Sequence, residues 1–140
     1  MRPQIIITAE VNMNIKEGYF YTKEHEWVKI EGAKAKIGIT DYAQHKLGDI
    51  TYVEPPAAGK QVKQFEILTG IESVKAASDI FSPMSGKIGS FNSSLESAPE
   101  LINKSPYDSG WIAEIVIKDA GETKNLMDSK AYAAYAAGLE

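Results

Sequence analysis

One lysine stands where its neighbours leave it open to chemical modification. Lys75 lies at the centre of residues 72–79, Glu-Ser-Val-Lys-Ala-Ala-Ser-Asp, whose small side chains do not shield its amine. Residues 65–71 before it and 80–86 after it are strand-like, and the second run leads into a Pro/Gly turn. Two strand-like runs joined by a short loop form a β-hairpin, so we expect Lys75 at the hairpin tip. An amine in that position is accessible to a lysine-modifying enzyme.

Other patterns of catalytic or metal-binding residues are missing from the sequence. It has no cysteine and only two histidines, His25 and His45, which lack the spacing and the third ligand of a zinc site. It also has no nucleophile elbow, phosphate loop or dinucleotide fingerprint. We expect no catalytic residue and no metal, and we expect His25 to be a turn residue bonded to the backbone. Any sulfur chemistry would have to come from an attached cofactor.

Composition predicts one acidic globular domain. A chain of 140 residues is long enough to bury a sizeable core. The net charge of −4 and the pI of about 5.3 give no electrostatic support to nucleic-acid binding. No stretch reaches the roughly 18 apolar residues of a membrane span, and the N-terminus lacks the layout of a signal peptide. We therefore expect an intracellular protein, cytoplasmic or, in a eukaryote, in the mitochondrial matrix.

The elements that must position Lys75 are mostly strands. Strand-like segments cover residues 27–30, 34–39, 49–54, 65–71, 80–91 and 111–117. Helices are expected at residues 41–47 after Thr40 as N-cap, as a turn within 95–103, and at 130–137 near the C-terminus. Turns about every 8–12 residues with peripheral helices favour a sandwich or barrel. Residues 1–17 fit none of this, so we expect an N-terminal extension, loose or with an edge strand over 5–8, before a domain at 18–140.

Five blocks of sequence between Tyr19 and Tyr132 resemble the glycine cleavage system H-protein family, in the right order and at the right spacing. They are residues 21–28 (Tyr-Thr-Lys-Glu-His-Glu-Trp-Val), 38–50 (Gly-Ile-Thr-Asp-Tyr-Ala-Gln, then Leu-Gly-Asp-Ile), the lysine segment 72–79, 99–103 (Pro-Glu-Leu-Ile-Asn) and 105–111 (Ser-Pro-Tyr, then Gly-Trp). Without this context Lys75 would be an ordinary solvated lysine. Biotinyl carriers place the lysine between methionines, and lipoyl domains of 2-oxoacid dehydrogenases usually place an aspartate before it. Here the neighbours are Val74 and Ala76.

The resemblance implies a mainly β fold of the lipoyl-domain type. This is a barrel-sandwich hybrid of two antiparallel sheets, with short peripheral helices and a C-terminal helix. It also implies that lipoate is attached covalently to Lys75 by a lipoate ligase or lipoyl transferase. The residues that this enzyme would recognise in the hairpin are Glu72, Ser73, Val74 and Ala76.

The function implied is that of a carrier and not of an enzyme. The lipoyl arm would receive an aminomethyl group from the pyridoxal-phosphate glycine decarboxylase and deliver it to a tetrahydrofolate-dependent aminomethyltransferase. A flavin-containing (FAD) dihydrolipoamide dehydrogenase would then reoxidise it. We expect such a shuttle to be a monomer. The alternative is an H-like lipoyl protein that acts in lipoyl relay, or as an interaction domain, outside glycine cleavage.

In the family the loaded arm folds into a cleft beside two carboxylates, which on this sequence are Glu26 and Asp79. The alternative reading of both is a solvated carboxylate in a turn. Two departures bear on the site. Phe65 stands where the family usually has glycine, which predicts an altered strand start or a bulge. Lys46 replaces a histidine found in some relatives, so no histidine is expected there in the cleft.

Overall fold

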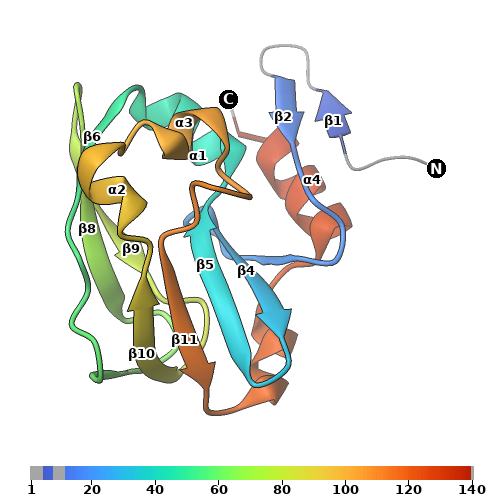
Figure 1. The fold of residues 1–140 in the computed structure, drawn as a ribbon. Helices are drawn as coiled ribbons and strands as arrows, with labels where there is room; N and C mark the ends of the chain where they lie inside the picture. The colour runs from blue at the N-terminus through green and yellow to red at the C-terminus, as the bar shows by residue number, and fades with distance from the viewer. Residues whose placement is uncertain (1–4, 8–11, 140) are drawn as a thin grey trace.

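The computed structural model describes residues 5–7 and 12–139, and its fold is mainly β, as predicted (Figure 1). Its strands are β1 (Ile5–Ile7), β2 (Asn12–Asn14), β3 (Phe20–Tyr21), β4 (Glu26–Glu31), β5 (Lys34–Ile39), β6 (Ile50–Val53), β7 (Gln61–Val62), β8 (Ile67–Ser73), β9 (Ala77–Phe81), β10 (Gly86–Phe91) and β11 (Ala113–Ile117). Its helices are α1 (Asp41–Leu47), α2 (Ser94–Ser97), α3 (Leu101–Lys104), the 3₁₀ helix η1 (Ala120–Asn125) and α4 (Ser129–Ala137). The turn expected within 95–103 is therefore made of α2 and α3.

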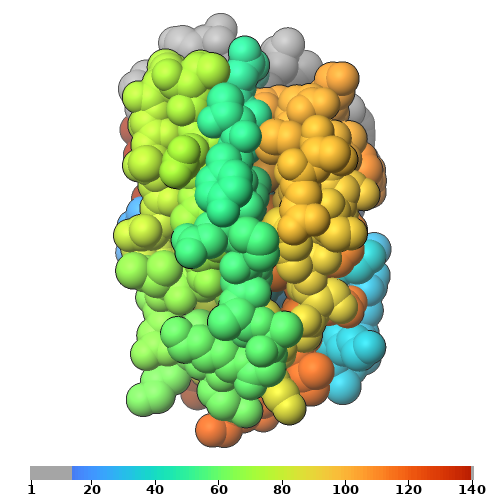
Figure 2. All heavy atoms as spheres, turned by 60° about the vertical axis from the view of Figure 1, so that its left-hand side comes forward, coloured from blue at the N-terminus to red at the C-terminus, as the bar shows by residue number. Residues whose placement is uncertain are grey.

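Two antiparallel sheets form the body of the protein, which confirms the predicted barrel-sandwich architecture. One has six strands in the order β3-β4-β5-β11-β10-β7, and the other has three in the order β6-β8-β9. Figure 2 shows the side of the three-stranded sheet, where β6 and the segment after it run down the middle of the face. The helices lie around this body, with α1, α2 and α3 near one end and α4 outside β4 (Figure 1).

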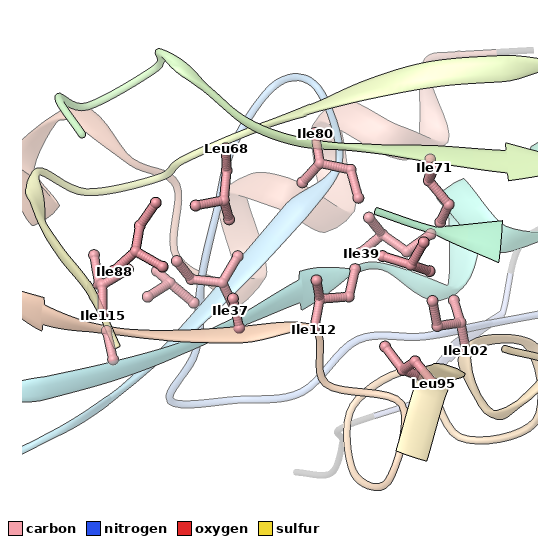
Figure 3. Packing of buried hydrophobic residues seen from close by; sticks show 14 of the residues in the cluster. Ile37, Ile39, Leu68, Ile71, Ile80, Ile88, Leu95, Ile102, Ile112 and Ile115 are labelled. Carbon is pink, nitrogen blue, oxygen red and sulfur yellow. The ribbon is translucent and has the colours of Figure 1, made fainter. Parts of the chain in front are cut away.

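The core lies between the two sheets, because the strands alternate buried and exposed residues. In β5, Ala35, Ile37 and Ile39 are all buried and point inward, as a period of two requires of a half-buried strand. Figure 3 shows Ile37 facing Leu68 and Ile80 of the opposite sheet. Leu95 of α2 and Ile102 of α3, each at most 1 % exposed, close one end of this core. Packing of this kind makes the hairpin of β8 and β9 a rigid support.

Helix α1 begins and ends as its sequence predicts. Thr40 is its N-cap, and the Thr40 hydroxyl accepts a hydrogen bond from the Ala43 amide at 3.2 Å. Gly48 follows the last turn with φ of +81°, and its amide donates to the Gln44 carbonyl. Only glycine adopts that conformation without strain. The turn at Gly48 leads the chain directly to the side of the hairpin tip.

A second buried cluster is aromatic and lies on the outer side of the six-stranded sheet. Trp27 is 1 % exposed, and its indole crosses Gly38, its partner on β5. A Cβ on Gly38 would lie 2.6 Å from the indole ring. Tyr132 of α4 stacks on Tyr21 with ring centroids 4.6 Å apart. Trp27 therefore packs against Tyr19 and Tyr107 on this outer face and not between the two sheets.

The N-terminal strands form a separate two-stranded sheet. Within the described residues β1 pairs with β2 alone, and Ile15 after β2 is 1 % exposed in the aromatic cluster. The Asn14 amide donates to the Asp41 carboxylate at 3.1 Å. Residues 1–4 and 8–11 of the expected extension lie outside the described residues, and its boundary at residue 17 stays a prediction. In the described part of the chain no helix has the length and apolar character to cross a bilayer.

Candidate functional site

Lys75 lies at the tip of a β-hairpin, as its surroundings predict. Strands β8 and β9 pair antiparallel, with Glu72 opposite Ala77, and residues 74–76 form the loop beyond Ser73. The Lys75 side chain is exposed. The four other residues expected to guide a modifying enzyme thus surround it on the same loop or on the strand ends beside it.

Ser73 organises this loop through its backbone and its side chain. The Ser73 amide donates to the Ala76 carbonyl at 2.8 Å. Its hydroxyl oxygen accepts from the amides of Lys75 at 3.2 Å and Ala76 at 3.1 Å. A serine hydroxyl that bonds to following amides fixes a turn without help from larger side chains. The loop therefore presents Lys75 in a defined position.

The tip is also attached to the body of the protein. The Val74 amide donates to the Asp49 carbonyl at 2.9 Å, and the Thr51 hydroxyl donates to the Glu72 carbonyl at 3.2 Å. The side chain of Lys75 runs across Gly48, since a Cβ there would lie 3.3 Å from Lys75 Cε. The turn after α1 thus supports the aliphatic part of the lysine and leaves its amine in solvent.

Glu26 is a buried carboxylic acid and not a solvated turn residue. It begins β4, is 2 % exposed, and its carboxylate accepts from the Phe81 amide at 2.9 Å and from the Thr22 hydroxyl. The Thr22 hydroxyl oxygen in turn accepts from the Glu26 amide at 3.1 Å. Burial raises the pKa of Glu26 to about 7, although these hydrogen bonds oppose the shift. Glu26 therefore titrates near neutral pH.

The structure brings Glu26 and Asp79 to the same hollow, of about 300 Å³. Asp79 lies on β9 opposite Gly70 and is exposed, so it retains the character of a solvated carboxylate. The rest of the lining is mixed, and its apolar part includes Ile39, Leu47, Ile71 and Ile80. Because Leu47 directly precedes Gly48, the hollow adjoins the glycine over which Lys75 lies. Glu24 also lines the hollow, so one of its three acids is buried and two are exposed.

Two cationic or titratable residues complete the hollow. Lys46 also lines it, and its ammonium lies 5.7 Å from the centre of the Tyr42 ring, where some relatives have a histidine instead. His25 contributes a histidine to the hollow all the same. Its Nδ1 lies 2.8 Å from the Tyr132 hydroxyl, which lies 2.8 Å from the Thr40 hydroxyl. Burial lowers the pKa of His25 to about 4, so its ring is neutral at pH 7.

The expectation for His25 was incomplete. Its backbone does bond within and beyond the turn, since its amide donates to the Thr22 carbonyl at 3.1 Å and its carbonyl accepts from the Thr40 amide at 2.9 Å. Its ring, however, is held by Tyr132 of α4, which lies 107 residues away. His25 also has φ of +75°, an unfavourable conformation for a residue with a Cβ. No local signal in the sequence predicts this contact.

Glu26 also borders a second hollow, of about 570 Å³, lined by apolar side chains of Phe65, Phe81, Leu126 and Met127 among others. Phe65 has φ of +70°, a conformation that favours glycine, the residue that the resemblance implies at this position. The pairing of β8 with β9 shifts register between Ile67 and Thr69, so the predicted bulge is present. In the part of the chain that the structure describes, no cluster of three or more metal-ligating side chains occurs.

Comparison with known proteins gives a consistent result. The family described as "Glycine cleavage H-protein" matches residues 19–138. The glycine cleavage system H protein of Thermotoga maritima is 50 % identical over 117 residues, which cover 84 % of this chain and 94 % of the relative. The glycine cleavage system H protein 2, mitochondrial, of Arabidopsis thaliana is 51 % identical over 115 residues, covering 82 % and 74 %.

A solved structure agrees with the sequence relatives. The crystal structure of a glycine cleavage system H protein from Mycobacterium marinum superimposes with a TM-score of 0.77 at 33 % sequence identity. The similarity covers 86 % of this chain and 97 % of that one.

Proposed function

The chain belongs to the glycine cleavage H-protein family, and we propose that it carries lipoate on Lys75 as the shuttle of the glycine cleavage system. Members of this family are lipoyl carriers in glycine cleavage. One observation supports Lys75 as the attachment site above all. It is the exposed amine on a loop whose shape the Ser73 hydroxyl fixes. In this proposal the protein has no catalytic residue of its own.

The residues around Lys75 suit lipoate as the attached group. Acylation turns an ammonium into a neutral amide, and among the described residues Lys75 forms no ion pair that this change would break. Val74, 66 % exposed, offers apolar surface beside an alkyl chain. Glu72, Ser73, Val74 and Ala76 are the residues on which a lipoate ligase or lipoyl transferase would recognise the hairpin.

The attached group supplies a disulfide that exchanges with thiols, which this cysteine-free chain cannot supply itself. The partners in the proposal are the pyridoxal-phosphate glycine decarboxylase, which loads the aminomethyl group, and the tetrahydrofolate-dependent aminomethyltransferase, which receives it. The FAD-containing dihydrolipoamide dehydrogenase restores the disulfide. We place this cycle in the cytoplasm, or in the mitochondrial matrix of a eukaryote, with the protein acting as a monomer.

We assign the hollow between Glu26 and Asp79 as the cleft that shelters the cargo. The apolar side chains of its lining would contact an alkyl arm, and the carboxylates of Glu26, Asp79 and Glu24 would face a cationic amine. Asp79 is exposed and free to pair with the amine on entry. Glu26 lies deeper, and because its pKa is about 7, a nearby cation would favour its ionised form. The amine of the cargo would thus be stabilised in the hollow to the extent that Glu26 is ionised.

The test is glycine–bicarbonate exchange by glycine decarboxylase with this protein as the carrier. We expect the lipoylated protein to support exchange and Lys75→Arg to abolish it while leaving the fold intact. The Lys104→Arg variant, altered at an exposed lysine on α3, serves as the matched control and should keep full activity. A protein that is lipoylated on Lys75 but supports no exchange would instead act in lipoyl relay or as an interaction domain.

A further inference from the structure

A groove rich in lysine lies at the end of the protein opposite Lys75. It is open, measures about 1410 Å³, and its rim carries Lys60, Lys63, Lys87 and Lys118. We call it the lysine groove. Its residues Glu66 and Ile67 stand at the start of β8, whereas Lys75 follows its end, about 20 Å away along the strand. In Figure 1 the hairpin tip is at the upper left, whereas the start of β10 and the end of β11, which contribute residues to the groove, are at the lower end of the body.

The floor of the lysine groove exposes two large apolar side chains. Ile67 is 56 % exposed and Val116 is 44 % exposed. Val116 points away from the core because its neighbour Ile115 is fully buried on the other side of β11. In the sheet register Val116 lies between Lys87 on β10 and Lys34 on β5. The sequence thus places an apolar residue among ammonium groups on an open face.

The carboxylates of the lysine groove are already engaged within the protein. Glu122 accepts from the Ser85 amide at 2.7 Å and from its hydroxyl at 2.6 Å. Glu66 accepts from the Lys63 amide at 2.9 Å, and Asp119 accepts from the Gly121 amide at 2.9 Å. These hydrogen bonds hold the three carboxylates in place but leave them charged, so together they offset part of the charge of the four lysines.

The lysines of the groove, by contrast, have no ionic partner in residues 5–7 and 12–139. The one ion pair found there joins Lys29 to Glu31 at 3.2 Å, outside the groove. Four lysines and three carboxylates line the groove, so its charge is positive on balance, and a concave surface concentrates that potential. The whole chain has a net charge of −4, so an average patch of its surface would be negative. The positive potential of the groove is therefore a local feature.

We propose that the lysine groove docks an acidic surface of an enzyme that uses the lipoyl arm. Aspartates and glutamates of the enzyme would face the lysines, and its apolar side chains would cover Ile67 and Val116. An apolar floor inside a charged rim is the arrangement of a protein interface, whereas the phosphate backbone of a nucleic acid would engage the lysines alone. Docking at this end would hold the carrier while the hairpin tip stays free to enter an active site. The inference relies on the proposed function for the identity of the enzymes.

The experiment compares two charge-reversal variants of the lipoylated protein as substrates. The groove variant is Lys60→Glu with Lys87→Glu, and the matched control is Lys104→Glu with Lys130→Glu; all four side chains are exposed. Both variants change the net charge equally. KM and kcat are measured for glycine decarboxylase, aminomethyltransferase and dihydrolipoamide dehydrogenase at low and high salt. A third variant, Val116→Gln, tests the apolar floor without a change of charge.

For at least one enzyme we expect the groove variant to raise KM about tenfold at low salt with kcat unchanged, because exposed charge pairs act on association and are screened by salt. The control should change KM by less than about twofold, and Val116→Gln should raise it for the same enzyme. Equal KM values for groove and control variants with all three enzymes would overturn the inference. The inference would also be overturned if the groove variant kept normal enzyme kinetics but lost DNA binding or self-association shown by the wild-type protein. Failure of the wild-type protein with every enzyme would instead refute the proposed function, and this inference with it.

Discussion

Glu26 and His25 are adjacent in the chain, and burial shifts their pKa values in opposite directions. The pKa of Glu26 rises to about 7 and that of His25 falls to about 4. A pKa that differs between the folded and unfolded states makes stability depend on pH. We therefore predict that substitution of one residue reveals the pH dependence of stability that the other residue contributes, because in the wild-type protein the two contributions oppose each other.

The sign follows from which state binds more protons. Between pH 4.5 and 7 the folded protein holds the Glu26 proton more tightly than the unfolded chain, so this group lowers stability as the pH rises. The unfolded chain protonates His25 below its ordinary pKa of 6.5 while the folded ring stays neutral down to about 4. His25 therefore raises stability as the pH rises through that window.

The two contributions differ in size. For the nearly fully buried Glu26 the shift corresponds to about 3 kcal/mol of unfolding free energy. For His25, whose ring is only partly shielded from water, about 1–2 kcal/mol remains after solvent screening. In the wild-type protein these two groups together should produce a decrease of about 1–2 kcal/mol from pH 4.5 to 7.

The perturbation is Glu26→Gln, with His25→Asn as its counterpart. A glutamine keeps both contacts, because its oxygen accepts from the Phe81 amide and its nitrogen donates to the Thr22 hydroxyl. Asparagine is among the residues that best tolerate the left-handed backbone of position 25. Glu26→Gln leaves the contribution of His25, so stability should rise by about 1–2 kcal/mol from pH 4.5 to 6.5. His25→Asn leaves that of Glu26, and stability should fall by about 3 kcal/mol from pH 4.5 to 7.

The assay is urea unfolding followed by tryptophan fluorescence at pH 4.5, 5.5, 6.5 and 7.5, with ΔG extrapolated to water. Differences between each variant and the wild type cancel the titration of all other groups. A Glu26→Gln curve parallel to that of the wild type would refute the reasoning, because it would mean that Glu26 ionises in the folded protein as it does in the unfolded chain.

Three further predictions concern the hairpin, the cleft and the aromatic cluster. Ser73→Ala removes the acceptor for the Lys75 and Ala76 amides, so the rate of lipoylation should fall several-fold with little change in melting temperature, and an unchanged rate would remove Ser73 from the recognition surface. Glu26→Ala should leave lipoylation intact but shorten the lifetime of the aminomethylated protein, measured as release of formaldehyde and ammonia, whereas Glu96→Ala at an exposed position on α2, away from the hollow, should have a smaller effect. Gly38→Ala places a Cβ 2.6 Å from the Trp27 ring and should cost about 1–3 kcal/mol of unfolding free energy. The loss should exceed that of Gly89→Ala, which changes an exposed position of β10. Equal losses for the two variants would contradict the packing described.

Local sequence signals predicted the parts of the fold that depend on neighbours in the chain. Thr40 and Gly48 delimit α1, and the small residues around Lys75 mark the hairpin, because caps and turns follow from the chemistry of a few adjacent residues. For Phe65 only the resemblance gave a signal, because it implies a glycine at this position. The left-handed backbone of Phe65 cannot be deduced from its aromatic side chain.

The remaining features depend on contacts between distant segments. The burial of Glu26 arises from Phe81 on another sheet, and the ring of His25 meets Tyr132 from the other end of the chain. The lysine groove combines side chains of β7, β10 and β11 with those of neighbouring loops. Such juxtapositions are set by the topology of the sheets, and no periodicity or spacing within one segment contains them.

The central claim is that lipoate is attached to Lys75, and intact-protein mass with peptide mapping tests it most directly. The unmodified chain and Lys75→Arg are each incubated with lipoate, ATP and a lipoate ligase, and circular dichroism establishes that both are folded. We predict one lipoyl increment on the wild-type chain, confined to the peptide that contains Lys75, and none on the variant. No increment on a folded wild-type chain, or an increment that persists in Lys75→Arg, would contradict the assignment.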